Sequence, residues 1–378
     1  MKDFVPKGTG NSRFLKSVSN FLSLYPDYPR FAQALIAGTL PVDFNGINSE
    51  GVQQMGTGLN KATLLTDATA AALELPQADP TVNDALYAIS QKTQPAQVNV
   101  LTTKGTVVTM TKGSKTLSAT AGNDGWATLY PAEFGDWTIK AGSTSKVFNV
   151  NAIAVFYVAM VSLASLSWDV VASCAKKGAA KDMWNIGDKK TLTIDGTTYT
   201  AVIIGFDHDN VANAGSYGRS KAGITWQLLD CLNTTYRMNS LATNNGGWTS
   251  CTMRTSTMAT LLGKLPTALK NNIVPVTKLT SAGDQSTTIN STTDSLFLLS
   301  EVEIFGAMTY SAAGEGVRYE YYAAGNGTIK KVKNLAYEWW ERSPKVDYSA
   351  AFCLVYRDGF ASNNRAGELG GVAFGFCV

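Results

Sequence analysis

The chemistry open to this chain is limited by its one histidine, His208. It lies in the segment FDHDN (Phe206–Asn210), which places two carboxylates, an imidazole and an amide next to one another after an apolar run. This segment is the best candidate for a set of metal ligands, but calcium prefers more oxygen ligands than it offers. We therefore interpret FDHDN as a solvated loop after a strand, and we expect no metal and no cofactor.

Thiol chemistry is the second candidate. The five cysteines are widely spaced, without the CxxC pairs of zinc or redox sites: Cys174, Cys231, Cys251, Cys353 and Cys377. The last two lie among apolar residues, and buried thiols of this kind are usually inert. We expect neither to act as a nucleophile.

The remaining catalytic motifs do not occur in the sequence. It contains no nucleophile elbow around a serine, no Walker loop and no Gly-x-Gly-x-x-Gly after a strand. Glu301 and Glu303 alternate in DSLFLLSEVEIFG, which we predict to be a buried strand with its two carboxylates on an exposed face. We therefore assign no catalytic residue and expect no enzyme.

The composition indicates what kind of scaffold surrounds these residues. The chain has 378 residues, enough for two or three domains, with 45% hydrophobic and 16% charged residues. Glycine, threonine, serine and asparagine are abundant, as in β-rich proteins with many turns. The net charge is only +3 and the basic residues are scattered, so we expect no nucleic-acid partner.

Neither export nor membrane insertion is indicated. Met1 is followed by polar residues, so we expect no signal peptide and synthesis in a cytoplasm. The most apolar run, residues 152–166, is short for a membrane span and contains serines. We predict that it forms one or two buried strands.

The sequence predicts a multidomain protein whose first part, residues 1–92, is helical. Apolar side chains recur at helical spacing on one face between Phe14 and Leu22. The stretch GTGLNKATLLTDATAAALEL (Gly56–Leu75), followed by DPTVNDAL, resembles the attachment region of tail and baseplate proteins of phages that infect Gram-positive bacteria. This resemblance implies that the region docks on phage tail or baseplate proteins, or oligomerises.

Residues 93–162 have a different pattern. Short alternating runs are separated by Gly, Asn and Asp, with turn signals every eight to twelve residues, which is typical of a small β-sandwich. We expect Trp126 and Trp137 in its core. The segment resembles the immunoglobulin-like spacer modules of surface and tail proteins, and we expect it to carry no chemistry.

Residues 163–378 are predicted to form an α+β domain. SWDVVASCAKKGAAKDMW suggests a helix with Ser167 as its N-cap. KKTLTIDGTTYTAVIIGF predicts a hairpin around Asp195-Gly196, a dipeptide that type I′ turns prefer. TSTMATLLGKLPTAL has the pattern of a second amphipathic helix.

The last forty residues combine a rigid frame with an unpatterned middle. WWERSP (Trp339–Pro344) predicts a strand whose two tryptophans face opposite sides, with a Glu341–Arg342 ion pair before the stop at Pro344. FCLV (Phe352–Val355) and GVAFGFCV supply two more core strands. The positions between these strands are aromatic, small or charged, the composition of a binding surface.

The order of these motifs resembles the variable proteins of diversity-generating retroelements. Trp-Trp-x-Arg-Ser-Pro, Phe-Cys-x-Val, Asp-Gly and the terminal Gly-Val-Ala-Phe-Gly-Phe-Cys-Val carry the resemblance, which extends over about residues 165–378. In that family a reverse transcriptase miscopies template adenines into the 3′ end of the gene. The resemblance implies a C-type lectin fold of the formylglycine-generating-enzyme subtype that displays the altered side chains on one face.

These considerations select fifteen candidate ligand-binding residues. They are Val346, Asp347, Tyr348, Ala350, Ala351, Leu354, Tyr356, Arg357, Phe360, Ser362, Asn363, Asn364, Arg365, Gly367 and Leu369. An asparagine codon mutated at its adenines can encode thirteen of them, and Asn363 and Asn364 would be unaltered codons. Lys345 and Glu368 need codons that end in a purine. An ordinary irregular loop on a lectin-like domain is the alternative.

The function expected from the resemblance is receptor binding by a phage tail protein located in the virion. Its variable face would bind a host-cell surface protein or glycan, without calcium. The tail setting favours a homo-oligomer, with a trimer as the arrangement that tail symmetry suggests. Two other interpretations remain open at this point: a bacterial surface adhesin of similar domain design, and an oxidase of the formylglycine-generating type.

Overall fold

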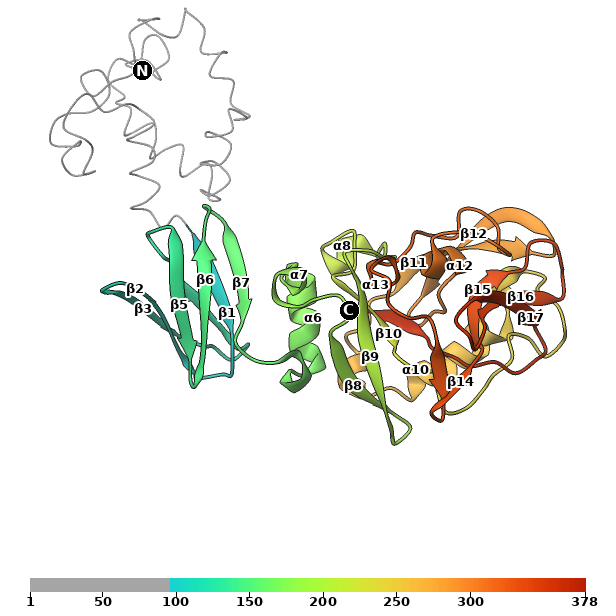
Figure 1. The fold of residues 1–378 in the computed structure, drawn as a ribbon, viewed down its shortest axis with the longest axis horizontal. Coiled ribbons are helices and arrows are strands. Elements are labelled where there is room, and N and C mark those ends of the chain that lie inside the picture. Colours follow the sequence, from blue (N-terminus) through green and yellow to red (C-terminus); the bar gives the residue numbers. More distant parts are fainter. Residues whose placement is uncertain (1–95) are drawn as a thin grey trace, which may run out of the picture. The chain divides into compact units, whose positions relative to one another are not determined.

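The computed structural model describes residues 96–378 (Figure 1). The helical region expected over 1–92 lies outside the described residues. The chain divides into two compact units, Met1–Met160 and Val161–Val378. The described part is mostly β-sheet with few helices, in agreement with the expected β-rich composition.

Two sheets build the described part of the first unit, with strand orders β4-β1-β7 and β3-β2-β5-β6. Their strands are β1 (Gln97–Leu101), β2 (Val107–Lys112), β3 (Lys115–Thr120), β4 (Trp126–Leu129), β5 (Gly135–Ala141), β6 (Thr144–Val150) and β7 (Val155–Ala159). Side chains of both sheets meet in one apolar cluster. The alternation of β5 shows why, since Trp137 and Ile139 point inward and their neighbours are exposed. Trp126 is also buried and packs edge-on against Tyr157.

The apolar run 152–166 differs from its prediction. It contributes a single strand, β7, of which only Val158 is buried. A 3-10 helix, η1 (Leu163–Ser165), follows. The strand pairs with β1 alone and lies at a sheet edge, where Val155 is exposed and three other residues are partly exposed.

The start of the second unit follows the local sequence signals. Helix α6 (Trp168–Lys177) begins after Ser167, whose hydroxyl accepts a hydrogen bond from the Val170 N–H at 3.3 Å. It ends at Gly178 with a φ of 75°, and the short helix α7 (Ala180–Met183) follows. The predicted helix and its cap are therefore confirmed.

A four-stranded sheet of order β18-β10-β9-β8 forms the next layer. The strands are β8 (Lys189–Ile194), β9 (Thr197–Phe206), β10 (Ile224–Leu228) and β18 (Gly375–Cys377). The predicted hairpin joins β8 to β9, and its turn residues Asp195 and Gly196 have φ values of 49° and 77°. The C-terminal strand β18 pairs with β10 across a long stretch of sequence and ends in the interior.

The middle of this unit departs from two predictions. The second helix is divided into a π-helix η2 (Met253–Met258), α10 (Ala259–Gly263) and α11 (Thr267–Lys270), with Pro266 interrupting the run. DSLFLLSEVEIFG is not a strand along its length: after Phe297 it turns into helix α12 (Glu301–Phe305). Ser300 and Glu303 form a capping box that starts this helix.

The remaining elements are hairpins and short helices. They are α8 (Ala214–Tyr217), α9 (Gly247–Ser250), α13 (Glu320–Ala323), β11 (Val276–Gly283), β12 (Ser286–Asp294), β13 (Lys330–Val332), β14 (Leu335–Tyr337), β15 (Trp339–Pro344), β16 (Ala351–Val355) and β17 (Ala361–Arg365). The last three form one antiparallel sheet in the order β15-β16-β17, drawn in red in Figure 1. None of the helices among the described residues is long and apolar enough to cross a membrane.

Candidate ligand-binding surface

A tight hairpin organises the middle of the C-terminal segment. The Tyr356 N–H donates to the Phe360 carbonyl at 2.8 Å, and the Gly359 N–H donates to the Tyr356 carbonyl at 2.8 Å. Gly359 has a φ of 92°, which glycine adopts without strain. This turn joins β16 to β17 in a register of five consecutive pairs, from Ala351↔Arg365 to Val355↔Ala361.

The central strand β16 is part of the framework. All five of its residues are buried, and because successive side chains point to opposite faces of the sheet, both faces of β16 are covered. Ala351 is 1% exposed and Leu354 is 2% exposed. Their selection as ligand-binding residues was wrong, since a side chain sealed in the interior cannot contact a ligand.

The other thirteen candidates reach the surface to different degrees. Asp347, Tyr348, Arg357, Phe360, Arg365 and Leu369 are exposed, and Val346, Ala350, Tyr356, Ser362, Asn363, Asn364 and Gly367 are partly exposed. The largest apolar ones are Phe360 at 73%, Leu369 at 47% and Tyr348 at 41%. They lie on the loop before β16, on the hairpin turn and on β17 with its following turn. Their role in binding remains a prediction.

The exposed side chains combine aromatic, cationic and amide groups. The guanidinium of Arg357 lies 5.0 Å from the ring centre of Tyr356, and its Nη2 donates to the Tyr356 hydroxyl at 2.7 Å. Lys345 and Asp347 form an ion pair at the surface. Aromatic rings and arginine supply most of the binding energy at many protein interfaces.

A network of buried charged side chains holds strand β15 in place. Arg342 is fully buried and donates to both carboxylate oxygens of Glu303, at 2.5 and 2.8 Å. Lys278 donates to Glu303 at 2.7 Å and to Asp209 at 2.8 Å. Burial alone would raise the pKa of Glu303, but the charges of Arg342 and Lys278 outweigh it and hold the pKa below its ordinary value.

This network corrects two predictions. Glu301 and Glu303 are buried on a helix instead of lying exposed on a strand. Arg342 pairs with Glu303 and not with its neighbour Glu341, because the two adjacent residues of β15 face different surroundings.

The loop before β16 is held by a buried asparagine that sequence reasoning missed. The Asn244 Nδ2 donates to the carbonyls of Lys345, Tyr348 and Ala351, at 3.3, 3.1 and 2.7 Å. Its Oδ1 accepts from the Asp284 N–H at 2.8 Å. A contact that spans about a hundred residues has no local sequence signal. The loop therefore keeps its path through backbone contacts that do not depend on its own side chains.

Glu341, in the buried strand β15, carries a carboxyl group without a hydrogen-bond partner among the described residues. Its side chain is fully buried. Burial raises its pKa well above the ordinary value, and the nearby Glu301 and Glu315 raise it further. The shift favours the neutral form of Glu341 in the folded protein, because an unpaired buried charge is costly.

The two cysteines considered as nucleophiles are inaccessible to solvent. Cys353 and Cys377 are both 0% exposed and both free. Burial raises the pKa of each thiol well above its usual value, and neighbouring carboxylates add to the effect. A protonated, inaccessible thiol is a poor nucleophile.

Part of the segment FDHDN is buried in the fold, although we expected it to be exposed to solvent. Asp209 is buried and accepts hydrogen bonds from Lys278, Thr225 and Tyr319. His208 stacks on Tyr319 with a ring-centre distance of 4.0 Å. The description of the whole segment as a solvated loop was wrong. No group of three or more His, Cys, Asp or Glu residues in 96–378 is placed to hold a metal ion.

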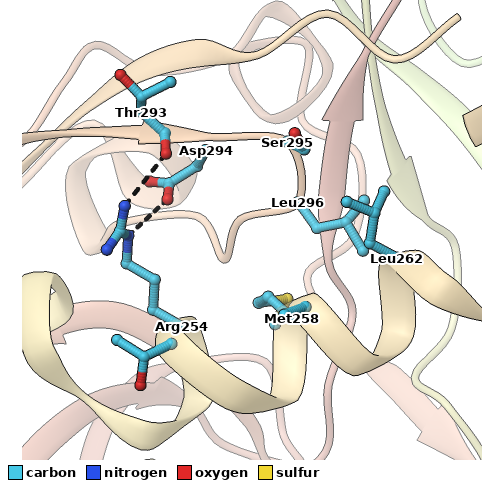
Figure 2. A pocket seen from close by; sticks show the side chains of 9 residues that line it. Arg254, Met258, Leu262, Thr293, Asp294, Ser295 and Leu296 are labelled. Carbon is cyan, nitrogen blue, oxygen red and sulfur yellow. Dashed lines mark hydrogen bonds and ion pairs between the residues drawn. The ribbon is translucent and has the colours of Figure 1, made fainter. Parts of the chain in front are cut away.

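A shallow open hollow of about 380 Å³ lies elsewhere on the second unit, between η2, α10 and the end of β12. Figure 2 shows Arg254 reaching toward Asp294 on one side, with Met258, Leu262 and Leu296 on the other. The Arg254 Nε donates to Asp294 at 2.6 Å, and Asp294 also accepts from Trp248 and Thr292. The charged groups of this hollow thus satisfy each other, and their contacts support the fold.

Comparison with known proteins adds one match. Residues 222–373 match a family model described as "Domain of unknown function (DUF6273)". No curated protein and no solved structure matches the chain. The matched segment includes β10 through β17, and therefore Arg342, Glu303, Lys278 and all the candidate surface residues described above.

Proposed function

We propose that this chain is a receptor-binding protein of a phage tail, and that retroelement mutagenesis diversifies its C-terminal surface. The observation that carries the proposal is the separation of two kinds of residue within one hairpin. Strand β16 is entirely buried, whereas the turn after it and the strand β17 present partly or fully exposed side chains.

This separation allows variation without loss of the fold. The framework is held by the Arg342–Glu303–Lys278 network and by the Asn244 contacts to backbone carbonyls. None of these interactions uses a side chain of an exposed candidate residue. Substitutions at exposed positions away from such networks usually change stability by about 0.5 kcal/mol or less.

The domain arrangement proposed with this function follows the resemblances. Residues 1–92 attach the protein to the tail or oligomerise it, and the two-sheet unit is an immunoglobulin-like spacer. The second unit adopts a C-type lectin-like fold of the formylglycine-generating-enzyme subtype. Its mixture of short helices and small antiparallel sheets supports this assignment.

Binding uses direct contacts from side chains. A patch of about 800 Å² per partner is typical of a stable interface, and thirteen exposed or partly exposed residues approach that size. The rings of Tyr348 and Phe360 and the guanidinium of Arg357 are the expected anchors. Several copies on one tail would add avidity to a weak single site.

A cell-binding experiment tests the proposal. The labelled full chain is mixed with a panel of intact Gram-positive bacteria, beside the variant Tyr348→Ala/Arg357→Ala/Phe360→Ala. We expect the chain to adsorb to some strains and the variant to lose this adsorption. The matched control replaces exposed residues of the first unit, Lys115→Ala and Val147→Ala, and should bind as the parent does. Equal adsorption of the parent and the triple variant would contradict the assigned surface.

The diversification step has its own test in the surrounding DNA. We expect a near-copy of the last hundred or so bases of the gene, differing at adenines, next to a reverse-transcriptase gene. A complete genome without such a repeat would contradict diversification and leave receptor binding to be judged by the adsorption experiment.

A further inference from the structure

The candidate surface ends in a free sheet edge. Strand β17 is the last strand of the β15-β16-β17 sheet and pairs with β16 alone. An edge strand presents unpaired backbone N–H and C=O groups, to which another extended chain can bind.

The hydrogen-bond pattern identifies the outward groups. In an antiparallel pair, directly opposed residues alternate between hydrogen-bonded and non-hydrogen-bonded pairs. The Tyr356 N–H donates to the Phe360 carbonyl, and the Ala366 N–H donates to the Ala350 carbonyl, so the hydrogen-bonded pairs contain the even-numbered residues. The backbone N–H and C=O groups of Ser362 and Asn364 therefore point toward β16. The N–H and C=O groups of Ala361, Asn363 and Arg365 therefore point away from β16.

The protein itself covers one end of this edge. The Arg365 N–H donates to the Asn364 side chain at 2.8 Å, and the Arg365 carbonyl accepts from the Glu368 N–H at 3.0 Å. The backbone groups of Ala361 and Asn363 have no such partner among the residues that the structure describes. Two adjacent outward positions, with four hydrogen-bonding groups, are thus left open.

Away from the covered end at Arg365, strand β17 lacks the usual protection of an edge. Natural edge strands are often blocked by proline, by lysine or by a β-bulge. The sequence ASNNR contains no proline or lysine, and its register with β16 is continuous. The exposed side chains of Phe360 and Leu369 lie in the segments just before and after the strand. They offer apolar cover at both ends for a strand that binds here.

We propose that the ligand is a protein, and that an extended peptide segment of it adds to the free edge of β17 at Ala361 and Asn363. This inference rests on the proposed function and specifies the chemistry of its partner. The backbone groups at this edge do not change when a side chain mutates to any residue other than proline. They provide a constant part of the affinity in every variant that has no proline at this edge, and the exposed side chains determine which peptide is preferred.

The test begins with a probe of defined chemistry. A phage-displayed library of random twelve-residue peptides is selected on the full chain, and an enriched peptide is synthesised with a fluorescent label. Its affinity is measured by anisotropy for the parent, for Asn363→Pro and for Asn363→Ala. Proline removes the outward N–H and is tolerated on the open side of an edge strand, whereas alanine removes only the side chain.

We expect Asn363→Pro to weaken binding about tenfold or more and Asn363→Ala to change it less than about threefold. Hydrogen exchange on the parent chain provides a readout that does not depend on how well the proline variant folds. The amides of Ala361 and Asn363 should exchange more slowly with the peptide bound.

Other results would overturn the inference. Peptides that lose affinity with Phe360→Ala but bind Asn363→Pro normally, without slower exchange at Ala361 and Asn363, would show recognition by side chains alone and leave the proposed function intact. Failure to enrich any peptide would exclude this edge as a peptide site. A chain that self-associates and becomes monomeric with Asn363→Pro would show that a second copy occupies the edge.

Discussion

Two phenylalanines of the same hairpin provide a direct test of whether buried residues hold the fold while exposed residues are free to vary. Phe352 on β16 is 0% exposed, and Phe360 after the turn is 73% exposed. We compare Phe352→Ala with Phe360→Ala, two substitutions of identical chemistry only eight positions apart.

The expected magnitudes follow from burial. Truncating a fully buried phenylalanine costs about 3–5 kcal/mol, because transfer free energy is lost and a cavity is left behind. A fully buried aromatic side chain removes about 200 Å² from water, and Phe360 removes about a quarter of this area. At ~25 cal/mol per Å², the loss for Phe360→Ala is about 1.3 kcal/mol. The two variants should therefore differ by at least about 2 kcal/mol.

Chemical denaturation of the full chain measures this difference. Six of the eight tryptophans lie in the second unit, so their fluorescence mainly follows its unfolding. The midpoint of this transition should fall markedly for Phe352→Ala and little for Phe360→Ala, at unchanged slope. Equal losses in the two variants would mean that the turn is part of the core, and would refute the idea of a display surface that varies independently of the fold.

Three further predictions concern the interior. Arg342→Met should destabilise the second unit by about 3–5 kcal/mol, because Glu303 would lose both hydrogen bonds from Arg342 and keep only Lys278 as a cationic partner. Arg357→Met at the surface should cost about 0.5 kcal/mol or less in the same denaturation assay. Burial raises the pKa of Glu341 above 4.5, so the folded state binds this proton more tightly than the unfolded state, and stability from this group is lost as pH rises above about 4.5. The midpoint of Glu341→Gln relative to the parent should therefore increase as the pH rises above about 4.5, and a difference independent of pH would contradict a raised pKa of Glu341. Cys353 and Cys377 should react with a thiol reagent only after unfolding, and rapid labelling of the native chain would contradict their burial.

The segment around β16 contains both exposed candidate residues, as the sequence predicted, and two buried ones. Composition and motif order located the surface segment, and thirteen of its fifteen residues are at least partly exposed. Ala351 and Leu354 were included because codon arguments and residue type do not report burial. Only the tertiary packing over both faces of β16 shows that these two belong to the interior.

The sequence by itself determined what depends on neighbouring residues. The cap at Ser167 and the Asp195-Gly196 turn were predictable, because a few adjacent residues fix such backbone conformations. Tertiary structure decided the partners of Arg342, the burial of Glu301 and Glu303, and the role of Asn244 in holding a loop about a hundred residues away. A buried charge or amide takes its partner from whichever segment the fold brings against it, and the residues beside it in the chain do not encode that choice.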